Sequence, residues 1–305
     1  MVRKVAIVIG ASRGMGADMA LALAKEKYHV VVTAKSQGAV AGYGKETKLK
    51  GKKIRTVDDV AAEITAAGGT ADAVQVDVRK VESIDEMVKK VVAMHGRVDV
   101  LIYNAGAIWW APVKETNNKR FELMQEVNVR GYYAAVQAVY PHMIKQKSGR
   151  IIGVSPPIYS RFFRGKTSYA VGKVGMSVLT MGLAFELEGS DIAVTSIWPA
   201  TAIQSAVTEI RSGTNMESLK HLRKASIFSD AIVGILSEPA EKVNGLCVID
   251  EDFLRDFKGV TDFSKYQVVP GFEPARSLPK KFPSLLVAEQ ADRGRPVTSV
   301  APSKL

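Results

Sequence analysis

The chain has 305 residues, of which 47% are hydrophobic, and carries a formal net charge of +11. This length suffices for one large domain or two modest ones, each with a substantial core. A single cysteine, Cys247, excludes an internal disulfide framework, and no apolar run is long enough to predict a membrane span. The histidines lie too far apart in the sequence for a local zinc motif, so we expect no metal site; they are His29, His95, His142 and His221.

Lysine and arginine outnumber aspartate and glutamate by 42 to 31, which favours an anionic partner: nucleic acid, an acidic membrane surface or a phosphorylated small molecule. Basic residues concentrate at positions 45–55 and in the last third of the chain. They lack the interleaved aromatic residues of a single-strand reader and any recognised groove-binding motif. We therefore expect an anionic small molecule and no nucleic acid.

The amino terminus is typical of a strand, a glycine-rich turn and a helix. Residues 4–9 form a β-branched run, and residues 17–25 are rich in helix formers. Glycines let a backbone approach a ligand closely, and the free N–H groups of a helix N-terminus attract a pyrophosphate. The segment between strand and helix therefore predicts a dinucleotide site; it reads Gly10-Ala-Ser12-Arg13-Gly14-Met15-Gly16.

The end of the second strand, residues 29–34, indicates which dinucleotide is preferred. An acidic residue that would hold the ribose hydroxyls of NAD is missing there, and the chain has Lys35 instead. Lys35 and Arg13 supply two cations where a 2′-phosphate would lie, which favours NADPH over NADH. The alternative is that both are ordinary solvated charges.

Residues 36–55 are expected to form a polar, basic loop to which we assign no role. Thr56 and Asp59 have the spacing of a capping box for a helix that extends to about residue 67. The third strand, residues 71–78, includes Asp77, whose carboxylate either accepts a hydrogen bond from the adenine amino group or caps the next helix.

The later chain continues to alternate helices with strands. Helices are expected at residues 84–94, 121–127, 129–144 and 168–187, and strands at 98–103, 150–154, 193–197 and 246–249. This alternation predicts an α/β fold: a doubly wound parallel sheet of about seven strands with helices on both faces. The small-residue turn after the strand at 98–103 lets the backbone approach a cofactor; it consists of Asn104, Ala105 and Gly106.

Tyr169 and Lys173 are four residues apart on an expected helix, so a phenol lies beside an ammonium. A nearby cation favours the ionised phenol and lowers its pKa toward the range useful for acid–base chemistry. Such a pair is more often a core ring and a solvated amine, so it needs support from the rest of the chain.

That support comes from the order of the motifs. The chain resembles the short-chain dehydrogenase/reductases over residues 1–252, because it has Gly10-x-x-x-Gly14-x-Gly16, Asp77, Asn104-Ala-Gly106, Asn128, a serine before the helix, and Tyr169-x-x-x-Lys173. Segments 154–157, 169–177 and 198–203 resemble one branch of that family more narrowly. The resemblance implies a single Rossmann-type domain that transfers a hydride between a nicotinamide and a carbonyl or alcohol carbon.

The resemblance also implies residue roles. Tyr169 would be the general acid or base, and Lys173 would hold the nicotinamide ribose and favour tyrosinate. Asn128 would hold a water of a proton relay, or alternatively cap a helix. The family's substrate-orienting serine corresponds to Pro156, so Ser155 can serve only if the Pro156-Pro157 bend turns its hydroxyl inward.

For the substrate pocket, the expected wall comprises Trp109, Trp110, Phe162, Phe163 and residues 201–228, the last as a lid. Thr201 or Ser205 would contact the carboxamide of the cofactor, although Pro199-Ala200 replaces the family's proline-glycine. We expect a hydrophobic ketone or aldehyde: steroid-like, fatty acyl or polyketide. The alternative, motivated by Pro156, is a nucleotide-binding protein that lost turnover and acts through partners.

Six of the twelve prolines follow Asp252, so residues 253–305 are expected to form an extended tail and not a second domain. The chain ends in Ser303-Lys304-Leu305, a tripeptide that the peroxisomal import receptor reads. The peroxisomal matrix is the expected compartment, with the cytosol as the alternative. The family resemblance further implies a homodimer or homotetramer formed through the two long helices at 129–144 and 168–187.

Overall fold

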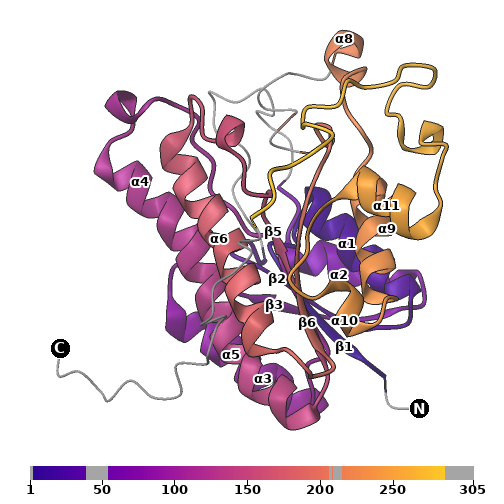
Figure 1. Ribbon diagram of the computed structural model, residues 1–305. Coiled ribbons are helices and arrows are strands. Elements are labelled where there is room, and N and C mark those ends of the chain that lie inside the picture. The colour runs from indigo at the N-terminus through magenta and orange to yellow at the C-terminus, as the bar shows by residue number, and fades with distance from the viewer. Residues whose placement is uncertain (1–2, 39–53, 206–207, 209–214, 286–305) are drawn as a thin grey trace.

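A computed structural model describes residues 3–38, 54–205, 208 and 215–285 of the chain. Its centre is one parallel sheet of seven strands in the order β3-β2-β1-β4-β5-β6-β7, covered by helices on both faces (Figure 1). The strands are β1 Val5–Ile9, β2 His29–Ala34, β3 Thr70–Gln75, β4 Val100–Tyr103, β5 Gly149–Val154, β6 Ile192–Trp198 and β7 Cys247–Ile249. The expected doubly wound, single-domain fold is confirmed.

The helices fall into two layers. They are α1 Gly14–Lys25, α2 Val57–Ala66, α3 Val81–His95, α4 Asn118–Gln125, α5 Gly131–Gln146, α6 Thr167–Glu186, α8 Met216–Leu219, α9 Ser226–Leu236, α10 Ala240–Val243 and α11 Asp250–Lys258. Helices α1, α2, α9 and α11 pack on one face of the sheet and α3, α5 and α6 on the other. Alternate residues of each strand serve the two cores, as Ala6 and Ile7 of β1 do.

The strand order reverses beside β1, whose neighbours are β2 and β4. In an open parallel sheet this reversal makes a crevice outside the carboxyl ends of the strands, and ligands bind there. The glycine turn follows β1 and the Asn104 turn follows β4, so both meet at this point.

The third strand is shorter than expected, because it ends at Gln75 and not at residue 78. Asp77 lies beyond it in a turn, where its backbone carbonyl accepts from the N–H of Lys80 and its side chain accepts from the N–H of Arg79. These local bonds replace the sheet ladder and end the strand.

The expectation of an extended tail from residue 253 is wrong for residues 253–285. The proposed boundary falls inside α11, and the chain that follows packs back onto the domain. Arg276 donates to both carboxylate oxygens of Asp252, at 2.7 and 2.6 Å, and the Ser277 N–H donates to the Ala200 carbonyl at 2.8 Å. Ion pairs and backbone hydrogen bonds hold this segment against the domain. Such contacts produce no periodic pattern in the sequence, so the sequence did not predict them. Residues 286–305, with the terminal tripeptide, lie outside the described residues.

Among the described residues, one helix, α6, is long and apolar enough to cross a membrane by length and composition. In its 18-residue apolar window, 56% of the residues are buried inside the protein. The expectation that no apolar run is long enough is corrected for this helix, whose burial is nevertheless typical of a core helix.

Candidate functional site

The glycine turn after β1 is packed too tightly for side chains. Gly10 and Gly14 have positive φ angles of 86° and 57°. A Cβ on Gly10 would lie 2.7 Å from the backbone nitrogen of Ala105, and one on Gly16 would lie 2.1 Å from the carbonyl oxygen of Gly10. Asn104 closes this contact, because its Nδ2 donates to the Gly10 carbonyl at 2.9 Å. The turns that follow β1 and β4 therefore pack against each other and form one surface.

Helix α1 begins at this surface. Its N-cap residue, Arg13, makes no side-chain capping bond, and the N–H groups of the first helical turn have no acceptor within the helix. Ser12 is buried, Arg13 is exposed, and Met15 and Gly16 follow within the first turn. The free donors and the positive end of the helix dipole favour an anion here.

Lys35 and Asp77 lie together at the edge of the crevice. The Nζ of Lys35 is 3.7 Å from Oδ2 of Asp77. The Nε of Arg79 donates to both oxygens of Asp77, at 2.9 and 3.2 Å, and these bonds hold the pKa of that carboxyl well below its usual range. Asp77 is thus an ionised partner of Arg79, and its role as an adenine acceptor stays a prediction that depends on its remaining lone pairs.

Tyr169 and Lys173 both lie in α6, with exposed fractions of 2% and 4%. The intervening Gly172 lets the helix come close to its neighbour, since a Cβ there would lie 3.3 Å from Cβ of Asn128. The Nζ of Lys173 donates to the Val154 carbonyl at 2.8 Å and lies 3.6 Å from the position a Cβ on Gly106 would take. Lys173 therefore lies under the Asn104-Ala105-Gly106 turn.

Burial governs the proton equilibria of this pair. It raises the pKa of Tyr169 above its ordinary value and lowers the pKa of Lys173 to about 7. The expectation that Lys173 lowers the pKa of Tyr169 is therefore wrong for the protein alone. The reason is that burial removes the phenol from water, while the Lys173 ammonium is itself buried and donates to the Val154 carbonyl.

Asn128 is fully buried in a π-helical segment, Glu126–Arg130, between α4 and α5. Its Oδ1 accepts from the N–H of Ala107 at 2.9 Å, and its Nδ2 donates to the carbonyl of Ala107 at 3.1 Å. Single π-helical turns occur frequently at functional sites. The amide ties this segment to the chain after Gly106 and does not cap a helix, and its part in a water relay stays a prediction.

Ser155 follows β5 and is fully buried, and its Oγ has no hydrogen-bond partner among the described residues. The bend after it is fixed, because the Ser177 hydroxyl donates to the Pro156 carbonyl at 2.6 Å. An unpaired buried hydroxyl costs about 1–3 kcal/mol, so an oxygen acceptor from a ligand would remove a real penalty. Thr201 is also buried, with its Oγ1 3.5 Å from a carboxylate oxygen of Glu251.

Aromatic residues surround Tyr169, as the sequence predicted for Trp109, Trp110, Phe162 and Phe163. The rings of Trp110 and Phe162 each lie 6.2 Å from the Tyr169 ring. Trp109 and Phe163 pack against the same cluster. Of the expected lid at 201–228, residues 206–207 and 209–214 lie outside the described residues.

The sequence analysis missed part of this wall: Tyr159, Trp198, Leu278 and Phe282. Phe282 belongs to the C-terminal segment and meets Tyr159 edge to face, with ring centroids 5.3 Å apart. No local motif marks Leu278 and Phe282, because they reach the cluster only when residues 274–285 pack back onto the domain.

Two of the supposedly scattered histidines also come together, away from this site. His29, Asp72 and His95 offer potential ligand atoms that all lie within 4.8 Å of one another. The wide spacing in the sequence excludes a local zinc motif, but it does not keep His29 and His95 apart in the fold. Spacing along the chain detects only local motifs, whereas the parallel sheet aligns residues from separate strands.

The buried ammonium generates a prediction about stability. Folding lowers the pKa of Lys173 from 10.5 to about 7, so between these pH values the unfolded chain binds more protons and the free energy of unfolding rises with pH. We expect Lys173→Met to remove this contribution, which is at most about 1.4 kcal/mol per pH unit. Urea unfolding of both proteins across this window measures the slopes. Parallel pH profiles would show that Lys173 keeps its ordinary pKa.

Comparison with known proteins places this geometry in a family. A family model described as short chain dehydrogenase matches residues 4–58 and 43–214. Hydroxysteroid dehydrogenase-like protein 2 is 38% identical in Danio rerio and 36% identical in Homo sapiens, each over 266 residues that cover 87% of this chain and 60% of the relative. The chain thus spans about 60% of the length of these relatives.

Solved structures agree. A short chain dehydrogenase of Mycobacterium thermoresistibile has 32% identity and a TM-score of 0.80 over 91% of this chain and 95% of its own. A metagenomic short-chain oxidoreductase in complex with NADP has 25% identity and a TM-score of 0.63 over 81% and 97%. The family match includes the glycine turn, Asn128, Tyr169 and Lys173. This chain belongs to the short-chain dehydrogenase/reductases.

Proposed function

We propose that the chain is an NADPH-dependent carbonyl reductase, reversible in principle, which acts on a hydrophobic ketone or aldehyde. The observation that carries this proposal is the placement of Tyr169. Its phenol is buried among aromatic rings, and Lys173 on the same helix reaches the turns that flank the nucleotide crevice. That arrangement joins a proton donor, an apolar pocket and an anion site.

The residues of the crevice fit a nicotinamide dinucleotide. Gly10, Gly14 and Gly16 keep the turn free of side chains, and the start of α1 offers N–H groups to a pyrophosphate. Lys173 has three N–H donors, of which Val154 and the sulfur of Met176 take two, so one is left for a ribose hydroxyl. When bound, the cofactor would supply or accept the hydride.

Tyr169 would serve reduction as a neutral phenol and oxidation as a tyrosinate. Because burial keeps the pKa of Tyr169 high, the phenol is neutral near pH 7 and can donate its proton to a carbonyl oxygen. In the oxidative direction tyrosinate would be needed, and Lys173, with a pKa of about 7, would have to be charged to stabilise it. The buried Asn128 would then connect Lys173 with solvent through a water.

We propose that Ser155 takes the role of the family's substrate-orienting serine, whose position Pro156 occupies. Its hydroxyl is buried and unpaired, and the residue directly follows Val154, whose carbonyl binds Lys173. A substrate oxygen would supply the missing acceptor. Orientation by Ser155 would leave Tyr169 to deliver the proton.

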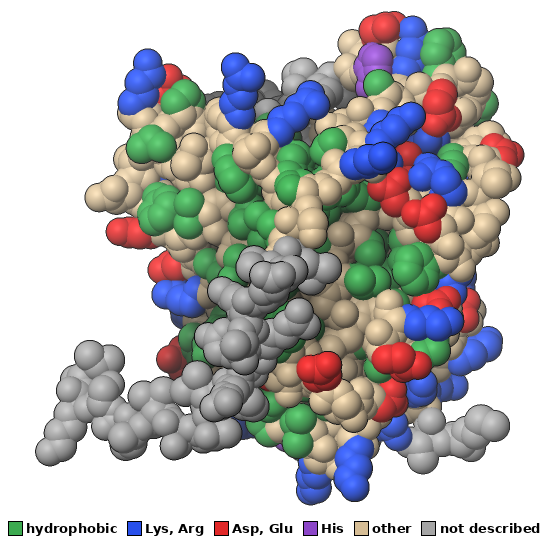
Figure 2. All heavy atoms as spheres, in the orientation of Figure 1, with side chains coloured by type: hydrophobic (Ala, Val, Ile, Leu, Met, Phe, Trp, Pro, Cys, Tyr) green, Lys and Arg blue, Asp and Glu red, His purple; other side chains and the backbone are tan. Residues whose placement is uncertain are grey.

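The pocket wall favours a hydrophobic substrate, in the steroid, fatty acyl or polyketide size range. Hydrophobic side chains lie over the middle of the face shown in Figure 2, and Lys and Arg side chains lie along its upper edge. Lys166 lies beside the aromatic cluster around Tyr169, with its Nζ 4.3 Å from the Phe162 ring centroid. Burial lowers the pKa of Lys166. An apolar carbonyl compound with an anionic group fits this distribution.

A second candidate is a nucleotide-binding protein without turnover, favoured by Pro156 at the serine position. The two functions differ in one measurable respect. A protein that binds NADPH but reduces none of a panel of apolar ketones and aldehydes would match the second candidate. The presence of Tyr169, Lys173 and Asn128 in one buried cluster supports the first.

We also propose a homodimer or homotetramer through α5 and α6. These helices expose large apolar residues that a partner subunit would cover: Tyr133, Ile144, Val171, Val178 and Phe185. Phe185 is 73% exposed, which is unusual for a phenylalanine on a core helix.

The function is tested by Tyr169→Phe, with Tyr159→Phe as the matched control from the same aromatic cluster. We expect Tyr169→Phe to lower kcat for NADPH oxidation by roughly 10²- to 10⁴-fold, which is the usual contribution of a general acid. The affinity for NADPH should stay nearly unchanged. The control should stay within a few-fold of wild type. Wild-type rates in Tyr169→Phe would refute the mechanism.

Cofactor preference is tested by the double variant Arg13→Ala/Lys35→Ala. Loss of two charge-assisted bonds to a 2′-phosphate should weaken NADPH about 10- to 100-fold and leave NADH affinity unchanged. Lys25→Ala, at the far end of α1, is a control for general loss of positive charge. An unchanged NADPH-to-NADH affinity ratio, measured by fluorescence titration, would show that other groups select the cofactor.

A peroxisomal matrix location is the corresponding proposal for the compartment, based on the terminal Ser303-Lys304-Leu305. Deletion of Leu305 should abolish import of a chain labelled at its amino terminus, since the receptor reads a free carboxyl-terminal tripeptide. Microscopy with a peroxisomal marker measures this. Import that persists after deletion of Leu305 would show that the terminal tripeptide is not the import signal.

A further inference from the structure

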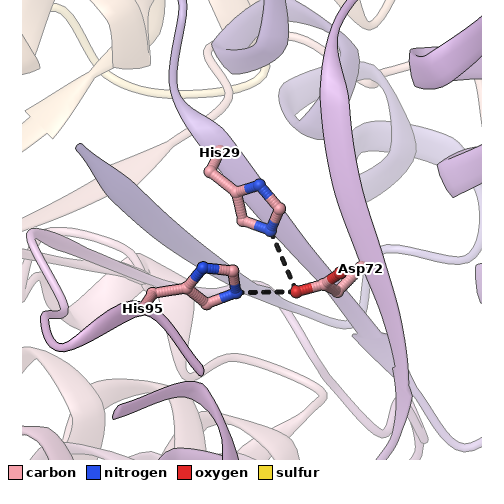
Figure 3. A group of neighbouring side chains, drawn as sticks. All are labelled: His29, Asp72 and His95. Carbon is pink, nitrogen blue, oxygen red and sulfur yellow. Dashed lines mark hydrogen bonds and ion pairs between the residues drawn. The ribbon is translucent and has the colours of Figure 1, made fainter. Parts of the chain in front are cut away.

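We infer that His29, Asp72 and His95 bind one divalent transition-metal ion, with zinc the best match, at the edge of the sheet opposite the nucleotide crevice (Figure 3). His29 is the first residue of β2, Asp72 lies within β3, and His95 is the last residue of α3. The inference does not depend on the proposed function. It concerns an ion that joins three elements of the fold.

Both imidazoles point at the same carboxylate oxygen. The Nε2 atoms of His29 and His95 lie 2.9 and 2.7 Å from Oδ2 of Asp72, and the two ring centroids are 4.2 Å apart (Figure 3). Two nitrogens and one oxygen that converge from separate elements form the donor set of a three-ligand zinc site. Water would complete the tetrahedron.

The required rearrangement is small. Zn²⁺ binds nitrogen at about 2.0–2.1 Å and carboxylate oxygen at about 2.0–2.2 Å, which sets neighbouring ligand atoms about 3.4 Å apart in a tetrahedron. The two oxygen–nitrogen distances must therefore lengthen by several tenths of an ångström. Rotation of the Asp72 carboxylate and the two imidazoles about their side-chain bonds can supply this shift.

The backbone already fixes each ligand. The N–H of His29 donates to the Lys4 carbonyl at 2.8 Å, and Asp72 is paired with Val31 in the register of β2 and β3. His95 ends α3 directly before Gly96, which has the left-handed conformation of a helix C-terminus. Binding would consequently require little loss of backbone entropy.

Solvent access is sufficient for an ion to enter. The side chains of His29, Asp72 and His95 are 15%, 28% and 20% exposed. Ligands that are mostly buried but still reached by solvent leave an entry path for the ion. Few water molecules then compete with the ion for the ligand atoms. Softer metals that prefer sulfur find no thiol in this set, whereas imidazole and carboxylate together suit Zn²⁺ and, by the same preferences, Co²⁺ and Ni²⁺.

The position predicts a structural effect. Within the described sheet β3 is an edge strand, and the site lies near the amino ends of β2 and β3, whereas Tyr169 and the glycine turn serve the carboxyl ends. An ion that links β2, β3 and α3 would oppose opening of this edge. It should raise thermal stability and leave carbonyl reduction unchanged.

The experiment uses the full, tag-free chain after chelator treatment and dialysis, titrated with ZnCl₂ by calorimetry. We expect one ion per chain and a higher unfolding midpoint. His29→Gln, His95→Gln and Asp72→Asn should each weaken binding by at least about 10-fold and reduce the midpoint shift. His142→Gln and Cys247→Ser, which remove other potential ligands, should bind like the wild type.

Absence of stoichiometric binding to the wild type would overturn the inference and leave a hydrogen-bonded histidine pair. Retention of full affinity in His29→Gln and His95→Gln would also overturn it, because the ion would then lie elsewhere. Far-UV circular dichroism verifies that each variant is folded. X-ray absorption of the zinc-loaded wild type needs no variant: imidazole and oxygen at about 2.0–2.2 Å support the site, and a sulfur ligand refutes it.

Discussion

The close approach of the turns after β1 and β4 constrains the rest of the site. Backbone atoms of Asn104 and Ala105 occupy the space that any side chain on Gly10 would need, and the Asn104 side chain completes the contact through its bond to the Gly10 carbonyl. This contact leaves the start of α1 open to an anion. It also brings Gly106 close to Lys173, so that the crevice beside β1 and helix α6 share one boundary.

Burial then sets the chemistry on that boundary. Helix α6 approaches the π-helical segment through Gly172, and Tyr169 and Lys173 are almost completely buried. Both pKa values move toward the neutral forms, upward for the phenol and downward for the ammonium. In the proposed carbonyl reduction, the proton would come from this neutral phenol.

The C-terminal segment adds Leu278 and Phe282 to the hydrophobic cluster around Tyr169. Arg223 is buried and pairs with Glu251 of α11 and with Glu273, and Arg276 pairs with Asp252. These ion pairs stabilise the path of the chain that brings Phe282 onto Tyr159. Loss of a buried partner would leave an uncompensated charge, so the pocket depends on residues well outside the motifs of the family.

Local sequence determined the elements, the glycine turn and the pairing of Tyr169 with Lys173, because periodicity, β-branching and short spacings act within a few residues. It therefore predicted the fold and most of the candidate site. Tertiary structure alone decided the direction of the pKa shifts, since these depend on burial by distant residues. It also decided the fold-back of residues 253–285 and the meeting of His29, Asp72 and His95. Ion pairs and cross-strand neighbours join positions tens of residues apart, and no pattern along the chain records them.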